Sequence, residues 1–150
     1  MANTKALKDI EKHIRDWCSR KYSVKFANHE KQLQLITGGV HKFDVVSEDG
    51  SIVAGVKTSA LRDNGKVGVG VIKSTFTELY FLSLVKANTK LMILTNNGYC
   101  KYFSRISKGK VAVGIEIIHC PLSKEIEEHI AVVHKNCRKE IGKKQFGARY

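Results

Sequence analysis

Hydrophobic residues recur at helical spacing near the start of the chain. They lie three or four positions apart, or side by side, at Leu7, Ile10, Ile14, Trp17 and Cys18. Asn3 or Thr4 can cap this segment, so the pattern predicts a helix over residues 3–21. Glu11 interrupts the apolar stripe, which puts its carboxylate on or beside the face that meets the core.

After Lys31 the apolar residues alternate with polar ones. The apolar positions are Leu33 and Leu35, then Phe43, Val45 and Val46, and then much of residues 52–56. This period predicts three strands in a meander. Gly38 and Gly39 lie between the first strand and the second.

A turn signal sets the register of the second and third strands. Asp49-Gly50 lies between them, and Asp-Gly favours a two-residue hairpin turn because both central positions need positive φ. Asp44 then lies directly opposite Gly55. The residues that share this face of the hairpin are Lys42, Asp44, Val46, Val53, Gly55 and Lys57. Asp44 and Lys57 are diagonal neighbours, about 7 Å apart at the backbone and within reach of a common ligand.

The rest of the chain alternates between helices and strands. The pattern predicts a glycine-bearing loop over residues 58–71, a helix over about 72–87, a strand over 90–95, a turn over 96–98, a helix over about 99–107, a strand over 114–119 and a helix from Ser123 to about Ile141. Ser123 is a suitable N-cap for the last helix. No linker or repeat divides the chain, so the order αβββαβαβα predicts a single α/β domain over residues 1–150, in which helices flank a mixed sheet.

The net charge of the chain indicates a class of binding partner. The 26 Lys and Arg residues against 14 Asp and Glu residues give a net charge of +12, which concentrates polyanions such as nucleic acid. A solvated surface is the alternative interpretation of so many lysines. The N-terminal segment lacks the apolar region of a secretory signal, and no apolar stretch is long enough for a bilayer, so we expect a cytoplasmic protein without a membrane partner.

The order of these elements and their charged residues matches a known pattern. Residues 38–44 (GGVHKFD), followed by residues 52–57 (IVAGVK), resemble the hairpin of the PD-(D/E)xK nuclease superfamily. The restriction-endonuclease-like αβββαβ core of that superfamily would cover residues 3–95, and residues 96–150 would extend it. The opening from Glu11 to Ile14 is similar to that of resolvase-like and repair-type members.

The resemblance implies metal-dependent hydrolysis of DNA phosphodiesters. Asp44 would be the central ligand of Mg²⁺ or Mn²⁺, with Glu11 as a further carboxylate and the backbone carbonyl of Val56 as a neutral ligand. Lys57 would position the nucleophile and support the charged transition state, while the metal lowers the pKa of the attacking water. Many enzymes of this type dimerise to cut both strands, although no residue of this sequence marks a dimer face.

One position departs from the superfamily pattern. The acidic member of the (D/E)xK element should stand at residue 55, and this chain has glycine there. Three explanations follow. The carboxylate has moved to the next helix, where Glu78 is the candidate metal ligand; or Glu11 suffices; or the site is inactive and the domain is a non-catalytic DNA-binding or assembly module.

Each acidic candidate also fits an ordinary structural role. These alternatives are Glu11 paired with Lys8 or Arg15, Asp44 paired with Lys42 or Lys57, and Glu78 exposed on its helix. A third class of function would keep only the fold, with a small molecule or a protein as partner. The strong positive charge disfavours that class.

Basic residues around the hairpin are candidates for DNA contacts. Arg62 and Lys66 lie in the glycine-bearing loop, Lys73 lies near the start of the next helix, and Lys42 lies on the hairpin. Such a loop can hold a phosphate through backbone amides and charge, and a solvated loop is the alternative. The basic end of the chain, from Arg138 onward, is expected to add to DNA binding.

Overall fold

The computed structural model describes residues 2–132, which fall into two compact units. The larger unit spans Glu11–Pro121, and the smaller one contains residues 2–10 and 122–132. The helix α1 (Ala2–Tyr22) contributes to both, because the boundary between the units falls within it. None of the described helices is long and apolar enough to cross a membrane.

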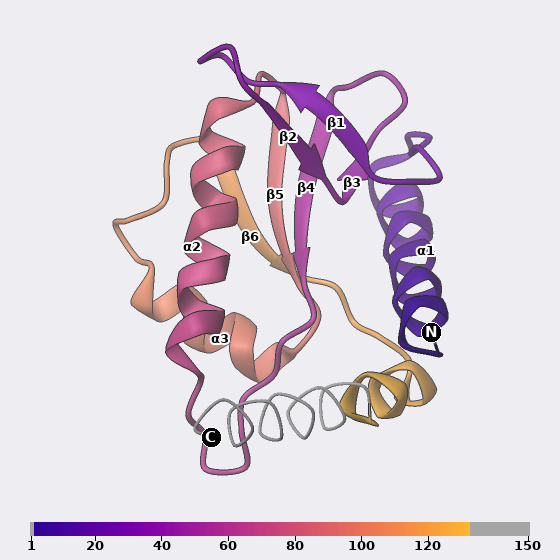
Figure 1. The fold of residues 1–150 in the computed structure, drawn as a ribbon, viewed down its shortest axis with the longest axis vertical. Coiled ribbons are helices and arrows are strands. Elements are labelled where there is room, and N and C mark those ends of the chain that lie inside the picture. Colours follow the sequence, from indigo (N-terminus) through magenta and orange to yellow (C-terminus); the bar gives the residue numbers. More distant parts are fainter. Residues whose placement is uncertain (1, 133–150) are drawn as a thin grey trace, which may run out of the picture. The chain divides into compact units, whose positions relative to one another are not determined.

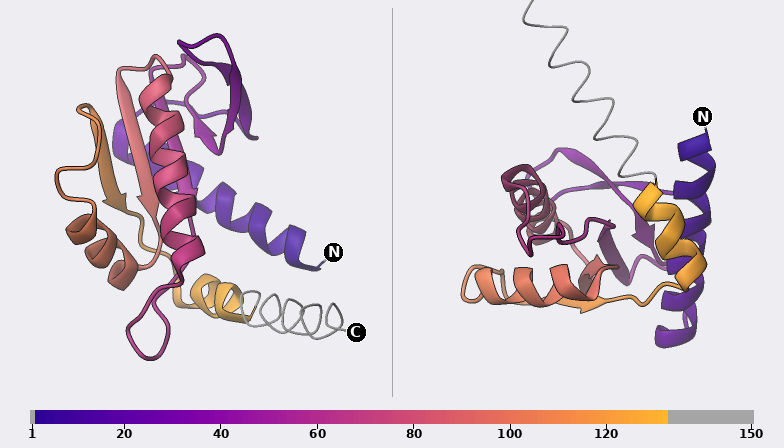
Figure 2. Two further views of the ribbon diagram at one scale, coloured as in Figure 1. Left: turned by 60° about the vertical axis from the view of Figure 1, so that its left-hand side comes forward. Right: turned by 90° about the horizontal axis from the view of Figure 1, so that it is seen from below.

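The larger unit is built on a mixed sheet of four strands (Figure 1). In spatial order these are β3 (Val45–Val46), β4 (Ile52–Lys57), β5 (Thr89–Leu94) and β6 (Ile115–His119). β3 runs antiparallel to β4, whereas β4, β5 and β6 are parallel. The helices α2 (Val69–Leu84) and α3 (Asn97–Ile106) lie on one side of the sheet, and the part of α1 in this unit lies on the other (Figure 2). The predicted α/β class is confirmed.

The core lies on both faces of this sheet. Leu91 and Ile93 point to one face of β5, Met92 and Leu94 point to the other, and all four are fully buried. A strand that is buried on both faces shows a continuous apolar run instead of an alternating one. This is why the predicted strand over residues 90–95 is found almost unchanged as β5.

The prediction of one continuous second strand is wrong, because the chain bends at Asp44. β2 (Val40–Phe43) pairs with β1 (Lys31–Gln34) in a separate antiparallel sheet, whereas β3 pairs with β4. The carboxylate of Asp44 accepts a hydrogen bond from the backbone N–H of Val56 at 2.9 Å. In a continued antiparallel ladder that N–H would donate to the carbonyl of Phe43, so the side chain ends the ladder.

The predicted register of the hairpin is confirmed, although its turn is longer than expected. The cross-strand pairs are Val45 with Ala54 and Val46 with Val53. The turn comprises residues 48–51, and within it only Gly50, at φ 74°, has a positive φ. One residue is added on each side of Asp49-Gly50, and this symmetric insertion leaves the pairing unchanged.

The later elements of the larger unit begin close to their predicted positions. α2 starts at Val69, three residues before the expected start. Asn96 was expected in a turn, and it is instead the N-cap of α3: its side-chain oxygen accepts a hydrogen bond from the backbone N–H of Tyr99 at 2.8 Å. An Asn-rich segment before a helix fits both roles, since the same side chain favours turns and caps.

The smaller unit confirms the predicted cap of the last helix. The helix is described over residues 124–132, and the hydroxyl oxygen of Ser123 accepts a hydrogen bond from the backbone N–H of Ile126 at 3.3 Å. Ile130 of this helix is buried. The predicted helix end near Ile141 and the basic segment from Arg138 onward lie outside the described residues.

Buried thiols lead to a first testable prediction. Cys18, Cys100 and Cys120 are buried, and burial raises the pKa of Cys18 to about 12 and that of Cys120 to about 11. Because only the thiolate reacts, a Cys137→Ser variant should show no fast-reacting thiol toward a disulfide reagent at pH 8 until denaturant is added. A thiol that reacts rapidly in the folded variant would contradict this burial.

Candidate functional site

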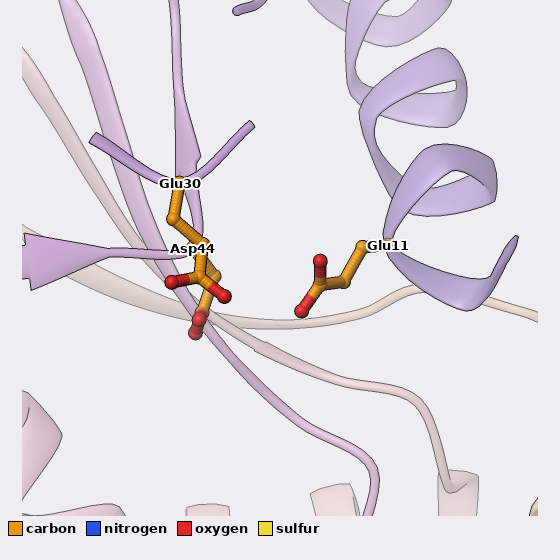
Figure 3. Close-up of side chains that lie close together, drawn as sticks. All are labelled: Glu11, Glu30 and Asp44. Carbon is orange, nitrogen blue, oxygen red and sulfur yellow. The ribbon is translucent and has the colours of Figure 1, made fainter. Parts of the chain in front are cut away.

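Three carboxylates converge where β2 and β3 separate (Figure 3). Glu11 comes from α1, Glu30 lies directly before β1, and Asp44 occupies the bend. Each offers an oxygen that lies within 4.8 Å of the oxygens of the other two, and all three residues are half-buried. The three carboxylates can therefore contact one small cation at the same time.

Glu30 was not identified from the sequence. In the β1–β2 sheet Lys31 pairs with Phe43, and continuing this register places Glu30 opposite Asp44. The glycines alone would have misled, because the backbone N–H of Leu35 donates to the carbonyl of Gly39 and the turn is therefore centred on Thr37. A two-residue turn at Gly38-Gly39 would have placed Glu30 opposite Ser47. Without the observed register, Glu30 is one acidic residue in a connecting segment.

Arg15 holds these acidic segments together. Its side chain is almost completely buried, and its Nη1 donates to the carbonyl of Asn28 at 3.0 Å. Its Nη2 donates to the carbonyl of Asp44 at 3.0 Å and lies 3.7 Å from a carboxylate oxygen of Glu11. The expected pairing of Glu11 with Arg15 is therefore present. It is part of a clamp that fixes α1 against the bend and against the segment that leads to Glu30.

The half-buried carboxylate of Asp44 has a raised pKa, although Lys57 and Arg15 are close enough to lower it. Burial raises its pKa, and the hydrogen bond from Val56 opposes this shift only in part. The charge of Glu30 raises the pKa further, while Lys57 lowers it. Among residues 2–132 neither candidate lysine forms an ion pair with Asp44. Lys42 instead pairs with Glu30 at 3.7 Å.

Glu78 lies over Gly55, and the interpretation of this residue as an exposed helix residue is wrong. Its side chain is only 13% exposed. A Cβ atom at residue 55 would lie 2.5 Å from Cγ and 2.9 Å from Oε1 of Glu78. Burial raises the pKa of Glu78, and the charge of nearby Asp44 raises it further. The carboxylate of α2 thus fills the space that a side chain at residue 55 would need.

Lys57 ends β4 beside these carboxylates. Its charge lowers the pKa of both Asp44 and Glu78, as expected for a cation close to both. Its Nζ donates to the hydroxyl of Ser74 on α2 at 2.7 Å. The predicted neighbourhood of Asp44 and Lys57 across the hairpin is consistent with this placement.

The basic loop before α2 folds back on itself. The backbone N–H of Arg62 donates to the carbonyl of Lys66, and that of Gly65 donates to the carbonyl of Arg62. Arg62, Lys66 and Lys73 are all exposed, as contacts with a phosphate backbone would require. Gly68, the N-cap of α2, supplies no side-chain hydrogen bond to the first turn.

A further basic surface lies on α3, and sequence reasoning missed it. Lys101, Arg105 and Lys108 are exposed and follow each other at four and three residues, so they share the solvent face of the helix and its following turn. No acidic residue occurs between Glu78 and Glu116. The signal was present in the sequence as a long segment with only positive charges.

Asp44 is common to two groups of side chains. It approaches Glu11 and Glu30 on the side of α1, and it interacts electrostatically with Glu78 and Lys57 on the side of α2. Oxygen donors of this kind suit hard divalent cations. The chain matches no protein-family model, no curated protein and no solved structure.

Proposed function

We propose that this protein is a metal-dependent DNA phosphodiester hydrolase with a restriction-endonuclease-like fold. One observation carries the proposal: the Glu78 carboxylate lies over Gly55, where the superfamily pattern has its second acidic side chain. Asp44 and Lys57, the other two elements of that pattern, interact electrostatically with it. This arrangement favours the explanation in which the missing carboxylate has moved to the following helix.

The order of elements supports the same proposal. A helix, a bent set of strands, a hairpin, a second helix and a parallel strand follow each other from α1 to β5. In the superfamily core the hairpin carries the acidic residue and the lysine, and here Asp44 directly precedes β3 while Lys57 ends β4. The bend at Asp44 adds one break to the predicted αβββαβ order and keeps the pairing of Val45 with Ala54 and of Val46 with Val53. The prediction that Lys42 shares this face of the hairpin is wrong, because Lys42 lies on β2 in the separate sheet.

The donor set fits Mg²⁺ or Mn²⁺. Asp44, Glu11 and Glu30 offer only oxygen atoms, and Glu78 is a further carboxylate that interacts electrostatically with Asp44. Desolvation raises the pKa values of Asp44 and Glu78 more than the nearby positive charges lower them, so a further cation would stabilise both carboxylates. A bound divalent ion would neutralise phosphate charge and lower the pKa of the attacking water.

Lys57 would contribute a positive charge, which the carboxylates of the site cannot supply. Its positive charge lowers the pKa of Asp44 and of Glu78, and its Nζ donates a hydrogen bond to the Ser74 hydroxyl. At this position it would stabilise the negative charge that develops on the phosphate oxygens in the transition state. The Ser74 hydroxyl reduces the number of conformations of this long side chain, so less entropy is lost when substrate binds.

The exposed basic residues would bind the DNA backbone. Lys42 is exposed on β2, Arg62 and Lys66 on the loop after β4 and Lys73 on α2, and the α3 surface offers a second set of cations. Phosphate contacts of this kind position a duplex without reading its sequence. Cleavage of both strands requires a second copy of the site, so a homodimer is the corresponding assembly.

The test is a calorimetric Mn²⁺ titration together with a cleavage assay on supercoiled and branched DNA. Wild-type protein should bind Mn²⁺ stoichiometrically and cut. Asp44→Ala should lose both properties, and Lys57→Ala should lose cleavage while it keeps DNA binding. Glu48→Ala, which removes an exposed carboxylate of the hairpin turn, is the matched control. Absent metal binding and cleavage, with salt-sensitive DNA binding retained, would favour the non-catalytic DNA-binding module instead.

Gly55 allows a direct prediction about Glu78. The Gly55→Ala variant should stay folded, because the flexible Glu78 side chain can rotate away from the new methyl group. We expect this displacement to weaken Mn²⁺ binding by about 10-fold or more. Gly39→Ala is the control, since a Cβ atom there meets nothing within 4 Å. Unchanged Mn²⁺ affinity in Gly55→Ala would separate Glu78 from the metal site.

A further inference from the structure

His41 is packed against α2 in a fixed orientation. Its ring lies on β2 and stacks on Phe81, with centroids 3.9 Å apart and planes 8° from parallel. A second ring, Phe43, meets it edge-on at 4.7 Å. The plane of the imidazole is therefore set by two aromatic neighbours, and rotation about its side-chain bonds is restricted.

This orientation directs the imidazole to Glu78. The Nε2 atom of His41 lies 3.4 Å from Oε1 and 3.3 Å from Oε2 of the carboxylate. An ionised carboxylate only accepts hydrogen bonds, so Nε2–H is the donor. Among the residues that the structure describes, His41 is the hydrogen-bond partner of this carboxylate.

Glu78 needs such a partner more than an aspartate at position 55 would. An aspartate on the strand would hold its carboxylate through two rotatable side-chain bonds. Glu78 reaches the same place from α2 through three rotatable bonds, and each one that is fixed costs conformational entropy. A donor that is itself locked by aromatic packing lowers the number of conformations open to the carboxylate.

We infer that His41 is a positioning residue that holds the Glu78 carboxylate over Gly55, in place to bind a divalent cation together with Asp44. The inference rests on the proposed function, because it assigns Glu78 a part in metal binding. It adds a residue that the PD-(D/E)xK pattern does not contain. Gly55 and His41 are two departures of this chain from that pattern, and the inference connects them. The glycine leaves space for the Glu78 carboxylate, and His41 holds the carboxylate in that space.

The test is Mn²⁺ titration of two variants at the same position. His41→Leu keeps an apolar side chain against Phe81 and removes the donor, so Mn²⁺ affinity should fall by about 10- to 100-fold. His41→Gln restores a donor at a similar reach and should recover most of the affinity. His29→Leu is the control, because that histidine is exposed. Equal affinities of His41→Leu and wild type would overturn the inference, and so would a Gln variant as weak as the Leu variant.

A double-mutant cycle separates this inference from the proposed function. His41→Leu, Glu78→Gln and their combination are compared in denaturant unfolding without metal. If His41 holds the Glu78 carboxylate, the effects of the two substitutions on the free energy of unfolding should not be additive. Additive effects on the free energy of unfolding would show that His41 and Glu78 do not interact, whether or not the protein binds metal. A wild-type protein that binds no Mn²⁺ but shows coupling would instead overturn the proposed function and the metal-related part of this inference.

Discussion

The Asp44→Asn variant is expected to lose Mn²⁺-dependent cleavage while its metal-free form becomes more stable than the wild type. Asparagine keeps the side-chain volume and an oxygen that can accept the hydrogen bond from Val56. It removes a negative charge that is buried close to Glu11 and Glu30. Loss of a central metal ligand should lower the cleavage rate by about 10³-fold. A gain of stability with a loss of activity is the signature of a charged functional site.

The pH dependence of this stability difference has a definite sign. Burial raises the pKa of Asp44 above its value of 3.8 in an unfolded chain. A group of this kind contributes its stability below the unfolded pKa, and that contribution is lost as the pH rises through the folded pKa. In EDTA, the Tm of Asp44→Asn minus the Tm of wild type should therefore grow from about pH 3 to neutral pH. Asp49 is present in both proteins, so its titration does not contribute to the difference in Tm between them.

Addition of Mn²⁺ should reverse the order of the two proteins. A ligand that binds only the folded state stabilises it, and Tm rises with the logarithm of the ligand concentration once that concentration exceeds Kd. Wild-type Tm should rise with Mn²⁺ concentration at neutral pH, and the Tm of Asp44→Asn should not. Thermal melts from pH 3 to pH 8, with EDTA or with Mn²⁺, make the measurement. A metal-free wild type that is more stable than the variant at neutral pH would contradict the electrostatic description of the site.

The Arg15→Met variant is expected to lose about 3–5 kcal/mol of unfolding free energy. Methionine fills much of the same space without the guanidinium donors. The carbonyls of Asn28 and Asp44 would then lose their hydrogen bonds, and Glu11 would lose its cation. Each unsatisfied buried carbonyl costs about 1–3 kcal/mol. Arg15→Lys should recover only part of the loss, because one ammonium cannot reproduce the planar fork.

Denaturant unfolding of Arg15→Met and Arg20→Met provides the comparison. Arg20 is on the same helix but exposed, so its replacement should change the unfolding free energy by only about 0.5 kcal/mol. Mn²⁺ binding should also be lost in Arg15→Met, because α1 and the bend at Asp44 would no longer be held together. Similar stabilities of the two variants would show that the Arg15 contacts do not hold this part of the fold.

Local patterns were sufficient for the features that depend on a few neighbouring residues. The first helix was predictable because its apolar positions repeat with helical spacing, and the Asp44–Gly55 register followed from the period of the strands and one turn. A symmetric error in the turn left that register intact. Ser123 was recognised as a cap because capping involves only the next few residues.

The composition of the site needed contacts between distant segments. Asp44, Lys57 and Glu11 were candidates from the sequence, but their approach to Glu30 depends on a second hairpin and on a buried arginine. The predicted continuous strand failed because a side chain of Asp44 replaced a backbone acceptor. The periodicity of apolar residues predicts which face of a strand a residue occupies. It does not predict that a side chain and a backbone carbonyl compete for the same N–H group.

The sequence by itself determined the α/β class, the hairpin register and the set of charged residues from which a site could form. Only the tertiary structure decided that Glu78 lies over Gly55 and that His41 contacts it. An error of one residue in the predicted phase of the helix turns the side chain of Glu78 by about 100° around the axis of α2. Packing of α2 against the sheet removes that uncertainty, because burial of its apolar side chains allows one rotation of the helix.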